Sequence, residues 1–299
     1  MTTVSVAVPR KGRPLEAVLE RIASRTGATD VADRISSTLR YEKAIAKGDQ
    51  SADADIYDRL AAYSDVATVT EPEYSILRDD RDGMPRRIVF DSVTIPTEDV
   101  DIRLIGREEP FRALRTHEFA LGFDSADLVL EEVVELRSDP LDGLDAVNER
   151  IDPRDTDVRV RTGLGDTVYH TLLGAPDVLS PGNPSLDRSF VAEYAGLLCI
   201  SPRYERLVEA VLGTDTLDGV EFTYPDSSQT EEAAVANAGL GVYLTVTGST
   251  AREHGLVVGE SLFPSETVLL ENDAERTDDT DAVAALVAGE DIETELPLV

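Results

Sequence analysis

The sequence predicts an α/β fold, because short apolar runs typical of strands alternate along the chain with stretches of helical spacing. Segments rich in glycine, proline and aspartate separate these runs and mark the connections. The 299 residues are long enough for two such domains, each with a sizeable core. A chain of two α/β domains is therefore expected.

In the first half of the chain, apolar alternation predicts strands and apolar residues at helical spacing predict helices. The expected strands cover residues 4–8, 74–77, 87–93, 101–105 and 120–123. The expected helices begin near Pro14 and after Pro110, or cover residues 51–62 and 126–132. Turn residues at 79–85 suggest that the second and third strands form a β-hairpin.

The second half continues the alternation, with strands expected at residues 168–173, 189–192, 220–224, 241–246 and 265–270. Helices are expected at residues 202–212 and 231–238. Residues 137–158 are polar and rich in aspartate, so they read as a loop or surface insertion. Residues 174–188, rich in proline and glycine, are the best candidate for an interdomain connection.

The composition is strongly acidic, with 59 acidic and 28 basic residues and a formal net charge of -31. The acidic side chains are spread along the whole chain, a pattern typical of the solvated surface of halophilic proteins. Non-specific nucleic-acid binding is not expected, because such a surface repels the phosphate backbone. A local basic pocket for a small anion remains compatible with this charge.

Cysteine and histidine usage and the apolar runs indicate a cytoplasmic protein without a structural zinc site. The one cysteine, Cys199, excludes an intramolecular disulfide and lies between apolar neighbours as a core residue would. No two of the three histidines have metal-ligand spacing. The N-terminal apolar run is too short for a signal peptide, and no apolar stretch approaches the length of a membrane span.

The segment most informative about function is residues 243–256, which runs from an apolar strand through Thr247-Gly248-Ser249-Thr250 into a short helical stretch. Gly248 permits a tight turn, and the hydroxyl and N–H groups around it can surround a phosphate. The alternative is an ordinary connection, because serine and threonine are common helix N-caps and glycine is a common turn residue.

Several segments, taken in order, resemble the ATP phosphoribosyltransferase family, the first enzyme of histidine biosynthesis. They include the strand and basic turn Ala-Val-Pro-Arg-Lys-Gly-Arg at residues 7–13 and Arg-Glu-Glu-Pro at 107–110. The Thr-Gly-Ser-Thr loop with His-Gly-Leu at 254–256 resembles the family's phosphoribosyl loop. Further matches lie at residues 121–132, 163–165, 172–176, 190–194 (as a strand), 226–231 and 265–270.

This resemblance implies a two-domain fold of the periplasmic-binding-protein type (type II), with ligands in a cleft between the domains. Domain I is expected over residues 1–172 and 257–275, and domain II, which carries the loop, over 173–256. Residues 276–299 are expected as a short acidic tail with a helix at most, and not as a regulatory domain. The family also implies a homo-oligomer, and a regulatory partner subunit is a further option.

The reaction implied by the resemblance is transfer of a phosphoribosyl group from phosphoribosyl pyrophosphate (PRPP) to N1 of ATP, with Mg²⁺. Thr247, Gly248, Ser249 and Thr250 would then bind the 5-phosphate. Pyrophosphate or the ATP phosphates would be bound by Arg10, Lys11, Arg13 and Arg107. Alternatively, Arg10, Lys11 and Arg13 lie in solvent at the start of the first helix, and Arg107 pairs with Glu108 or Glu109 at the surface.

Asp124 and Asp127 could bind Mg²⁺ through water, whereas a helix N-cap is the alternative for Asp124. Tyr194 could stack on a purine or pack in the core. His254 is expected to cap the end of the short helix rather than to act in catalysis.

The chain departs from the family pattern where the resemblance places acidic residues. Tyr243 stands where the family has an acid that holds the ribose hydroxyls, and Ala120 replaces another aspartate. Two alternatives to the transferase therefore stay open. One is a non-catalytic regulatory paralogue that binds phosphoribosyl compounds or nucleotides, and the other is a phosphoribosyltransferase that uses another base.

Overall fold

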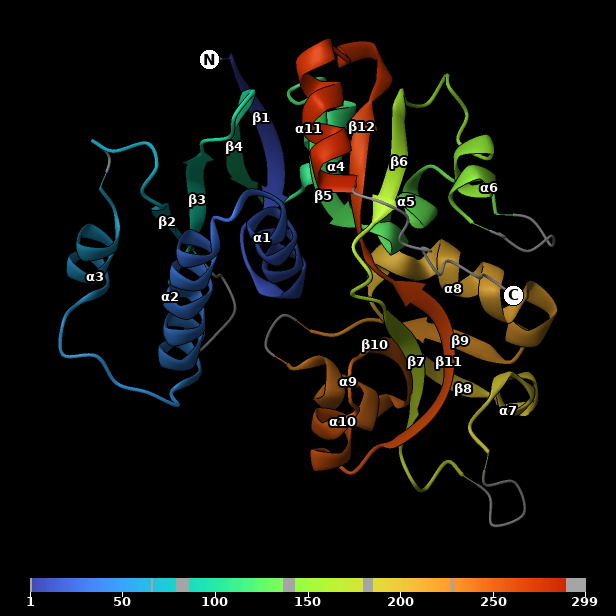
Figure 1. Cartoon of the computed structure of the whole chain (residues 1–299). Coiled ribbons are helices and arrows are strands. Elements are labelled where there is room, and N and C mark those ends of the chain that lie inside the picture. Colours follow the sequence, from blue (N-terminus) through green and yellow to red (C-terminus); the bar gives the residue numbers. More distant parts are fainter. Residues whose placement is uncertain are drawn as a thin grey trace. The chain divides into compact units, whose positions relative to one another are not determined.

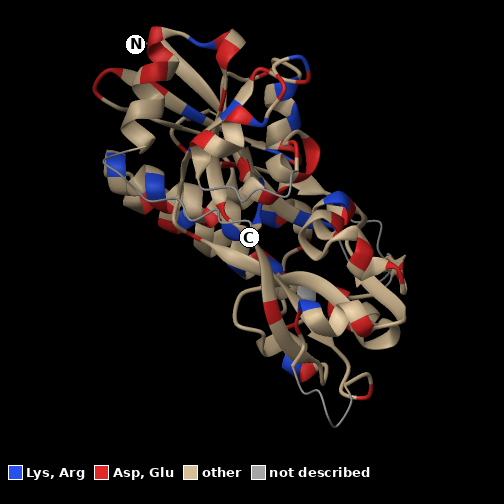
Figure 2. Cartoon of the chain, turned by 90° about the vertical axis from the view of Figure 1, so that its right-hand side faces the viewer, with Lys and Arg blue, Asp and Glu red and all other residues tan. Residues whose placement is uncertain are grey.

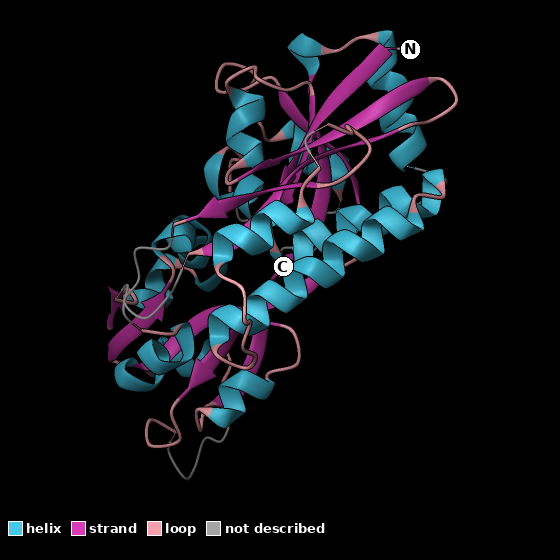
Figure 3. Cartoon of the chain, turned by 90° about the vertical axis from the view of Figure 1, so that its left-hand side faces the viewer, coloured by secondary structure: helices cyan, strands magenta, loops and turns pink. Residues whose placement is uncertain are grey.

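The computed structural model describes residues 2–65, 67–78, 86–136, 143–179, 185–226 and 229–288. These residues form two compact units, each built around one β-sheet. Unit 1 contains the chain up to Ser125, Pro153–Asp166 and the described residues from Thr267 onward. Unit 2 contains Ala126–Asp152 and Thr167–Glu266. Helices flank the strands in each unit (Figures 1 and 3).

Unit 1 is organised by a seven-stranded sheet with the order β2-β3-β4-β1-β5-β12-β6. β1 is parallel to both of its neighbours, β4 and β5, whereas β12 is antiparallel to β5 and β6. The strands are β1 (Thr2–Pro9), β2 (Glu73–Leu77), β3 (Arg87–Ile95), β4 (Val100–Arg107), β5 (Leu121–Ser125), β6 (Val158–Gly163) and β12 (Thr267–Asn272). Because β4 and β5 lie on opposite sides of β1, the carboxyl end of β1 is a switch point where α/β sheets commonly bind ligands.

The core of unit 1 forms between one sheet face and three helices, with Val6 and Val8 of β1 packing against Leu15 and Val283. A fourth helix lies on Ala7 and Gly122, where an added Cβ at Gly122 would come within 2.5 Å of Leu114. The helices of unit 1 are α1 (Gly12–Thr26), α2 (Thr29–Lys47), α3 (Ile56–Tyr63), α4 (Pro110–Arg115) and α11 (Asp278–Ala288), with the 3-10 turn η3 (Asp273–Glu275). The helix allowed in the expected acidic tail is α11, and its Val283, Ala284 and Val287 are part of this core.

Unit 2 is organised by a five-stranded sheet with the order β11-β7-β10-β8-β9. β10 is parallel to β8 and antiparallel to β7, which pairs on its other side with β11. The strands are β7 (Val168–Gly174), β8 (Gly196–Ile200), β9 (Val220–Thr223), β10 (Gly239–Thr245) and β11 (Val257–Ser265). The helices are α5 (Ala126–Glu132), α6 (Leu144–Glu149), α7 (Arg188–Glu193), α8 (Glu205–Leu212), α9 (Glu231–Ala238) and α10 (Ser249–Glu253), with 3-10 turns η1 (Pro202–Tyr204) and η2 (Thr214–Leu217).

The division into units differs from the domain boundaries expected from the sequence. β7 and β11 pair with each other in the second sheet, although residues 168–172 and 257–265 were expected in domain I. Residues 126–152 also group with unit 2. The described part of 174–188 connects β7 to α7 within unit 2, so it is not an interdomain connection.

The strand predicted at residues 189–192 is wrong, because these residues belong to helix α7. Asp187 is the cause, since its side chain accepts a hydrogen bond from the Phe190 backbone N–H at 3.0 Å and caps the helix. The strand that follows is β8, which the sequence reading did not predict. The family-like segment 190–194 is therefore a helix and its end, not a strand.

Most other predicted elements are confirmed, including the antiparallel pairing of β2 with β3. The turn expected at 79–85 lies outside the described residues, as does the tail beyond residue 288. The helix α2 and the strand β6 were not predicted. The described part of the expected loop 137–158 contains α6.

Acidic residues occur on elements throughout both units and are interspersed with the less numerous basic residues (Figure 2). Within the described ranges, no helix is both long and apolar enough to cross a membrane.

Candidate functional site

The predicted phosphate loop connects β10 to the short helix α10 in unit 2. Gly248 has a φ of 69°, in the left-handed region, and an added Cβ would lie 2.9 Å from Val258 Cγ2. The Thr247 and Ser249 hydroxyl oxygens are 3.0 Å apart, and the Ser249 N–H donates to Thr247 Oγ1 at 3.4 Å. The turn is therefore tight, requires glycine at its centre, and gathers two hydroxyl groups.

Arg252 stabilises this loop, although the sequence did not predict it as a site residue. Arg252 Nη1 donates to the Thr247 carbonyl at 2.9 Å. Its side chain comes from the helix that follows the loop, only two residues beyond Thr250. Arginine pairs well with phosphate oxygens, so Arg252 adds positive charge beside the hydroxyl groups.

The loop lines a cavity of about 260 Å³. Two carboxylate residues of the same cavity, Glu231 and Glu232, come from the first turn of α9. The resemblance of residues 226–231 to a family turn that ends in glutamate is the sequence signal that could have identified them as site residues. The cavity thus combines hydroxyl and N–H groups on the β10–α10 turn with carboxylates on α9.

Tyr243, which the resemblance places where the family has an acid, is a buried residue in the lining of this cavity. Its side chain is 5% exposed, and its hydroxyl lies 3.7 Å from the Cys199 sulfur. Burial raises the pKa of Tyr243 far above its ordinary value, so the phenol stays neutral. Burial also raises the pKa of the Cys199 thiol, and its expected place in the core is confirmed.

Arg10 lies at the carboxyl end of β1, but its guanidinium is already held within unit 1. Nε donates to the Phe90 carbonyl at 3.2 Å, and Nη2 contacts the Asp91 carboxylate at 3.2 Å as well as the Ser75 hydroxyl. Nη1 lies 3.7 Å from Glu108. Arg10 is therefore a fixed cation at the edge of the sheet, not a mobile surface side chain.

Lys11 and Arg107 flank the same edge, because β1 and β4 are parallel and Pro9 pairs with Arg107. Lys11 Nζ lies 3.5 Å from Glu108. Arg107 lies 3.9 Å from the carboxylate of Glu118 and 4.9 Å from the centre of the Phe119 ring. The surface partner of Arg107 is thus Glu118, not Glu108 or Glu109 as the sequence suggested.

Arg13 belongs to an internal contact of unit 1. Its guanidinium binds both the carboxylate and the backbone carbonyl of Asp166. Asp166 also accepts hydrogen bonds from the Thr267 N–H at 2.7 Å and hydroxyl at 2.8 Å. Arg13 therefore fastens the start of α1 to the start of β12, and an anion would have to compete with Asp166 for it.

The two aspartates predicted for Mg²⁺ do not fit a metal site. Asp124 accepts from the Phe111 N–H and the Ser125 N–H, both at 2.9 Å, and so caps α4 rather than the helix that follows it. Asp127 Oδ2 lies 2.8 Å from His170 Nε2. Their carboxylate oxygens are engaged within the protein, and the described residues contain no group of three or more possible metal ligands.

Tyr194 and His254 have local structural roles. The Tyr194 hydroxyl donates to the Leu197 carbonyl at 3.2 Å, and its ring stacks with Phe190 at 5.8 Å between centroids. His254 follows α10, and its Nδ1 lies 3.0 Å from the Thr250 carbonyl. These contacts fit packing for the tyrosine and capping for the histidine.

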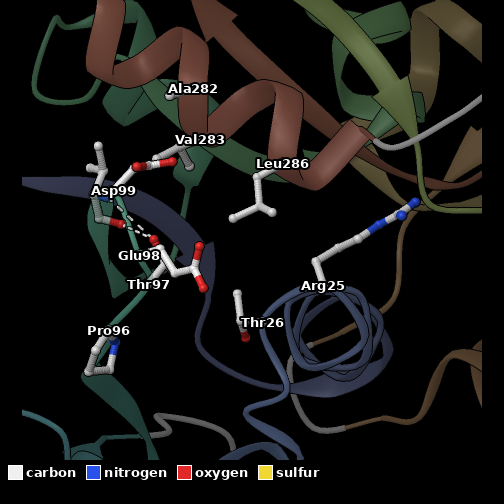
Figure 4. Close-up of a pocket in the computed structure, with 10 residues that line it drawn as sticks. Arg25, Thr26, Pro96, Thr97, Glu98, Asp99, Ala282, Val283 and Leu286 are labelled. Atoms are coloured by element: carbon white, nitrogen blue, oxygen red, sulfur yellow. Dashed lines mark hydrogen bonds between the residues drawn. The ribbon is translucent and has the colours of Figure 1, made fainter.

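A second cavity, of about 510 Å³, lies in unit 1 (Figure 4). It is bordered by the end of α1, the turn before Val100 at the start of β4, and the face of α11 that carries Val283 and Leu286. Its charged lining residues are Arg25, Glu98 and Asp99. The sequence reading did not predict it.

Fold and site together define an α/β protein with two sheets and with polar groups gathered at strand ends. A family model described as "Halobacterial ATP phosphoribosyltransferase" matches residues 1–298. The chain belongs to this family, which is a family of transferases in histidine biosynthesis. No curated protein sequence matches the chain.

The solved structures that match this chain share little sequence with it. The ATP phosphoribosyl transferase (HisG:HisZ) complex from Thermotoga maritima is 13% identical, with a TM-score of 0.47 over 94% of this chain and 93% of that chain. The periplasmic VFT2 domain of BvgS from Bordetella pertussis is 12% identical, with a TM-score of 0.42 over 95% of this chain and 86% of that one. A mutant of arginine-bound ArgBP from T. maritima is 13% identical, with a TM-score of 0.35 over 62% and 75%.

Proposed function

We propose that the protein transfers the phosphoribosyl group of PRPP to N1 of ATP. The observation that carries this proposal is the cavity in unit 2, where the Thr247–Gly248–Ser249–Thr250 turn and the carboxylates of Glu231 and Glu232 line one space. Hydroxyl and N–H donors suit the 5-phosphate, and carboxylates suit the vicinal ribose hydroxyls, which are hydrogen-bond donors. Family membership supports the same substrates.

In this reaction, adenine N1 forms a bond to C1 of the ribose as the bond from C1 to the pyrophosphate oxygen breaks. Positive charge grows on the ribose ring and negative charge grows on the departing pyrophosphate. Glu231 and Glu232 would orient the ribose and favour its positive charge. Arg10, Lys11 and Arg107, at the carboxyl edge of β1 and β4, would favour the charge on phosphate groups of pyrophosphate or ATP.

Mg²⁺ is expected from the family and would neutralise pyrophosphate oxygens. Asp124 and Asp127 are not proposed as its ligands, because both carboxylates are engaged in internal contacts. The metal would therefore reach the protein mainly through the substrate phosphates. A homo-oligomer, a regulatory partner subunit and a cytoplasmic location remain predictions, the first of which light scattering at high KCl would test.

The activity is tested by mixing the protein with ATP, PRPP and Mg²⁺ at high KCl and following the absorbance of phosphoribosyl-ATP, beside an active control enzyme. Turnover is expected. Folded protein without turnover would argue against the transferase. Phosphorylated-ligand binding would then favour the regulatory paralogue, whose motivation is the neutral Tyr243 in place of an acid. Consumption of PRPP with another base would favour the third alternative.

The site is tested separately by calorimetry with PRPP, ribose 5-phosphate and inorganic phosphate. Thr247→Ala should weaken all three. The double variant Glu231→Gln/Glu232→Gln should weaken only the two ribose compounds, by about tenfold or more, since it removes charge-assisted hydrogen bonds to hydroxyl groups. Glu209→Gln, an exposed change on α8, is the matched control and should alter none of them. Equal loss for phosphate and ribose 5-phosphate would disprove the carboxylate role.

A further inference from the structure

The carboxylate of Glu108 occupies the position between Arg10 and Lys11. Glu108 is the first residue after β4, and the two cations are the first two residues after β1. Because the strands are parallel and in register from Thr2 to Pro9, these residues emerge at the same edge of the sheet. One oxygen of Glu108 lies 3.7 Å from Arg10 Nη1, and the other lies 3.5 Å from Lys11 Nζ. A single phosphate group could span the same two cations with two of its oxygens.

Arg10 is held in place by groups other than Glu108. Phe90, Ser75 and Asp91 bind its Nε and Nη2, which leaves Nη1 directed at Glu108. The fit is close, because a Cβ added at Gly106 would lie 2.5 Å from the Phe90 carbonyl oxygen and 3.0 Å from Arg10 Cγ. Arg10 would therefore keep its orientation if the Glu108 carboxylate moved away, and an incoming anion would meet a preorganised donor.

Glu108 itself is held weakly. Its side chain is 45% exposed, and both contacts are longer than a good charge-assisted hydrogen bond. Ion pairs with this exposure contribute little, because solvent screens them and replaces them readily. A displaced Glu108 would be hydrated rather than left unpaired in the interior. The free energy needed to replace the Glu108 carboxylate by a phosphate group is therefore small.

We propose that Glu108 is an internal competitor that occupies an anion-binding site formed by Arg10 and Lys11 and is displaced by a phosphate group of a di- or triphosphate ligand. The inference deepens the proposed function, which gives such ligands to this protein, but its binding test does not need turnover. Displacement imposes the same cost on every anion that enters the site. Glu108 thus lowers the affinity of the site for every anion by the same factor, which reduces the occupancy by weakly bound anions. In the empty site, its carboxylate lies between the two cations.

The test is calorimetry at one fixed KCl concentration, with inorganic pyrophosphate and inorganic phosphate as ligands. Glu108→Gln should bind both more tightly, by about three- to tenfold, because two partly exposed ion pairs no longer compete. Glu109→Gln is the matched control. Its carboxylate is the next along the chain and lies 3.3 Å from Arg112, so this change should leave both affinities unaltered.

The ratio of the two gains separates displacement from simple repulsion. Displacement predicts the same factor for phosphate and pyrophosphate, whereas repulsion by a carboxylate that stays in place predicts a larger gain for the more highly charged ligand. The increase in affinity caused by Glu108→Gln should also be smaller in the Lys11→Gln background than in the wild type. The inference would be overturned if Glu108→Gln increased the affinities for phosphate and pyrophosphate by different factors, or if Glu109→Gln had the same effect as Glu108→Gln. It would also be overturned if neither the wild type nor Glu108→Gln bound pyrophosphate. Tight pyrophosphate binding without phosphoribosyl transfer would overturn only the proposed function.

Discussion

Asp127 and His170 form a buried pair in unit 2, with Asp127 Oδ2 2.8 Å from His170 Nε2. The two side chains are 2% and 5% exposed. The imidazole is stacked on Phe263, with 4.3 Å between ring centroids, and meets the edge of Tyr204 at 4.8 Å. A carboxylate predicted as a metal ligand thus serves to fix the start of α5 against the sheet of unit 2.

His170→Ala should destabilise the protein by about 3–5 kcal/mol, because it leaves the Asp127 carboxylate buried without its partner. Adding Asp127→Asn to that variant should restore part of the loss, since the uncompensated charge is removed. Urea unfolding at high KCl measures both effects. Asp145→Asn, an exposed change in the first turn of α6, is the control and should stay within about 0.5 kcal/mol of the wild type. Stabilisation by Mg²⁺ that disappears in Asp127→Asn would contradict this account.

Gly248→Ala should both destabilise the protein and weaken phosphate binding. The left-handed conformation of this residue costs a non-glycine residue about 1–2 kcal/mol, and the added Cβ would press on Val258. Gly255→Ala separates backbone strain from loop function. Gly255 has a φ of 74°, but an added Cβ would meet no atom within 4 Å. It should lose comparable stability while binding ribose 5-phosphate normally, as calorimetry and urea unfolding would show. Equal affinity losses in the two variants would mean that the turn has no special role in binding.

Local signals were sufficient for most elements and for the tight turn at residues 247–250, because strand alternation and turn residues lie within a few neighbouring positions. They failed at residues 189–192, where a short apolar run fits a strand or a helix and the Asp187 cap decides for the helix. The helix α2 was also missed, although its apolar positions Val31, Ile35 and Leu39 recur every four residues and so lie on one helix face.

The partners of the predicted cations could not be read from the sequence. The carboxylate that binds Arg13 lies 153 positions along the chain at Asp166, and Glu108 is 97 positions from Lys11. Composition indicates only that carboxylates are abundant. Strand pairing decides which of them reach the edge of the sheet, and sheet order is a non-local property. The same holds for Glu231 and Glu232, which reach the phosphate loop through the packing of α9 on β10.

Tyr63 should make the stability of the wild type depend on pH in the alkaline range. Burial, together with the hydrogen bond to the buried Glu42 at 2.9 Å, raises the pKa of Tyr63 to about 12. An unfolded tyrosine titrates near pH 10, so above that pH the unfolded state releases the proton first. The stabilising contribution is complete below about pH 10 and is lost as pH rises towards 12.

This contribution is measured from the free energy of unfolding of the wild type and of Tyr63→Phe, each at pH 9 and pH 11.5. The change between the two pH values is then compared between the two proteins. The wild type should lose more stability than Tyr63→Phe between the two pH values. Tyr41→Phe, which removes an exposed hydroxyl on the same helix as Glu42, should behave like the wild type. A wild type and a Tyr63→Phe protein with parallel pH profiles would show that Tyr63 titrates normally in the folded protein.

Glu271 in β12 is fully buried and pairs with two arginines, at 3.0 Å from Arg161 and 3.8 Å from Arg276. Burial nevertheless raises the pKa of Glu271 above its ordinary value, so the cost of desolvation outweighs the attraction of both cations. A raised folded-state pKa means that stability from this group is present below the unfolded pKa of about 4.3 and declines as pH rises through the folded value. Ionised Glu271 is thus a poor source of stability at neutral pH.

Two variants should therefore have unequal effects at neutral pH. Glu271→Gln should be neutral or stabilising and should flatten the profile of stability above pH 4, because the amide needs no ionisation and the arginines are partly exposed. Arg161→Ala should cost about 1–3 kcal/mol, since it leaves the buried carboxylate with the more distant Arg276. The same change should cost little in the Glu271→Gln background, because no buried charge is then left behind. A large destabilisation by Glu271→Gln, comparable to that of Arg161→Ala, would show instead that the ion pair is a net source of stability in this sheet.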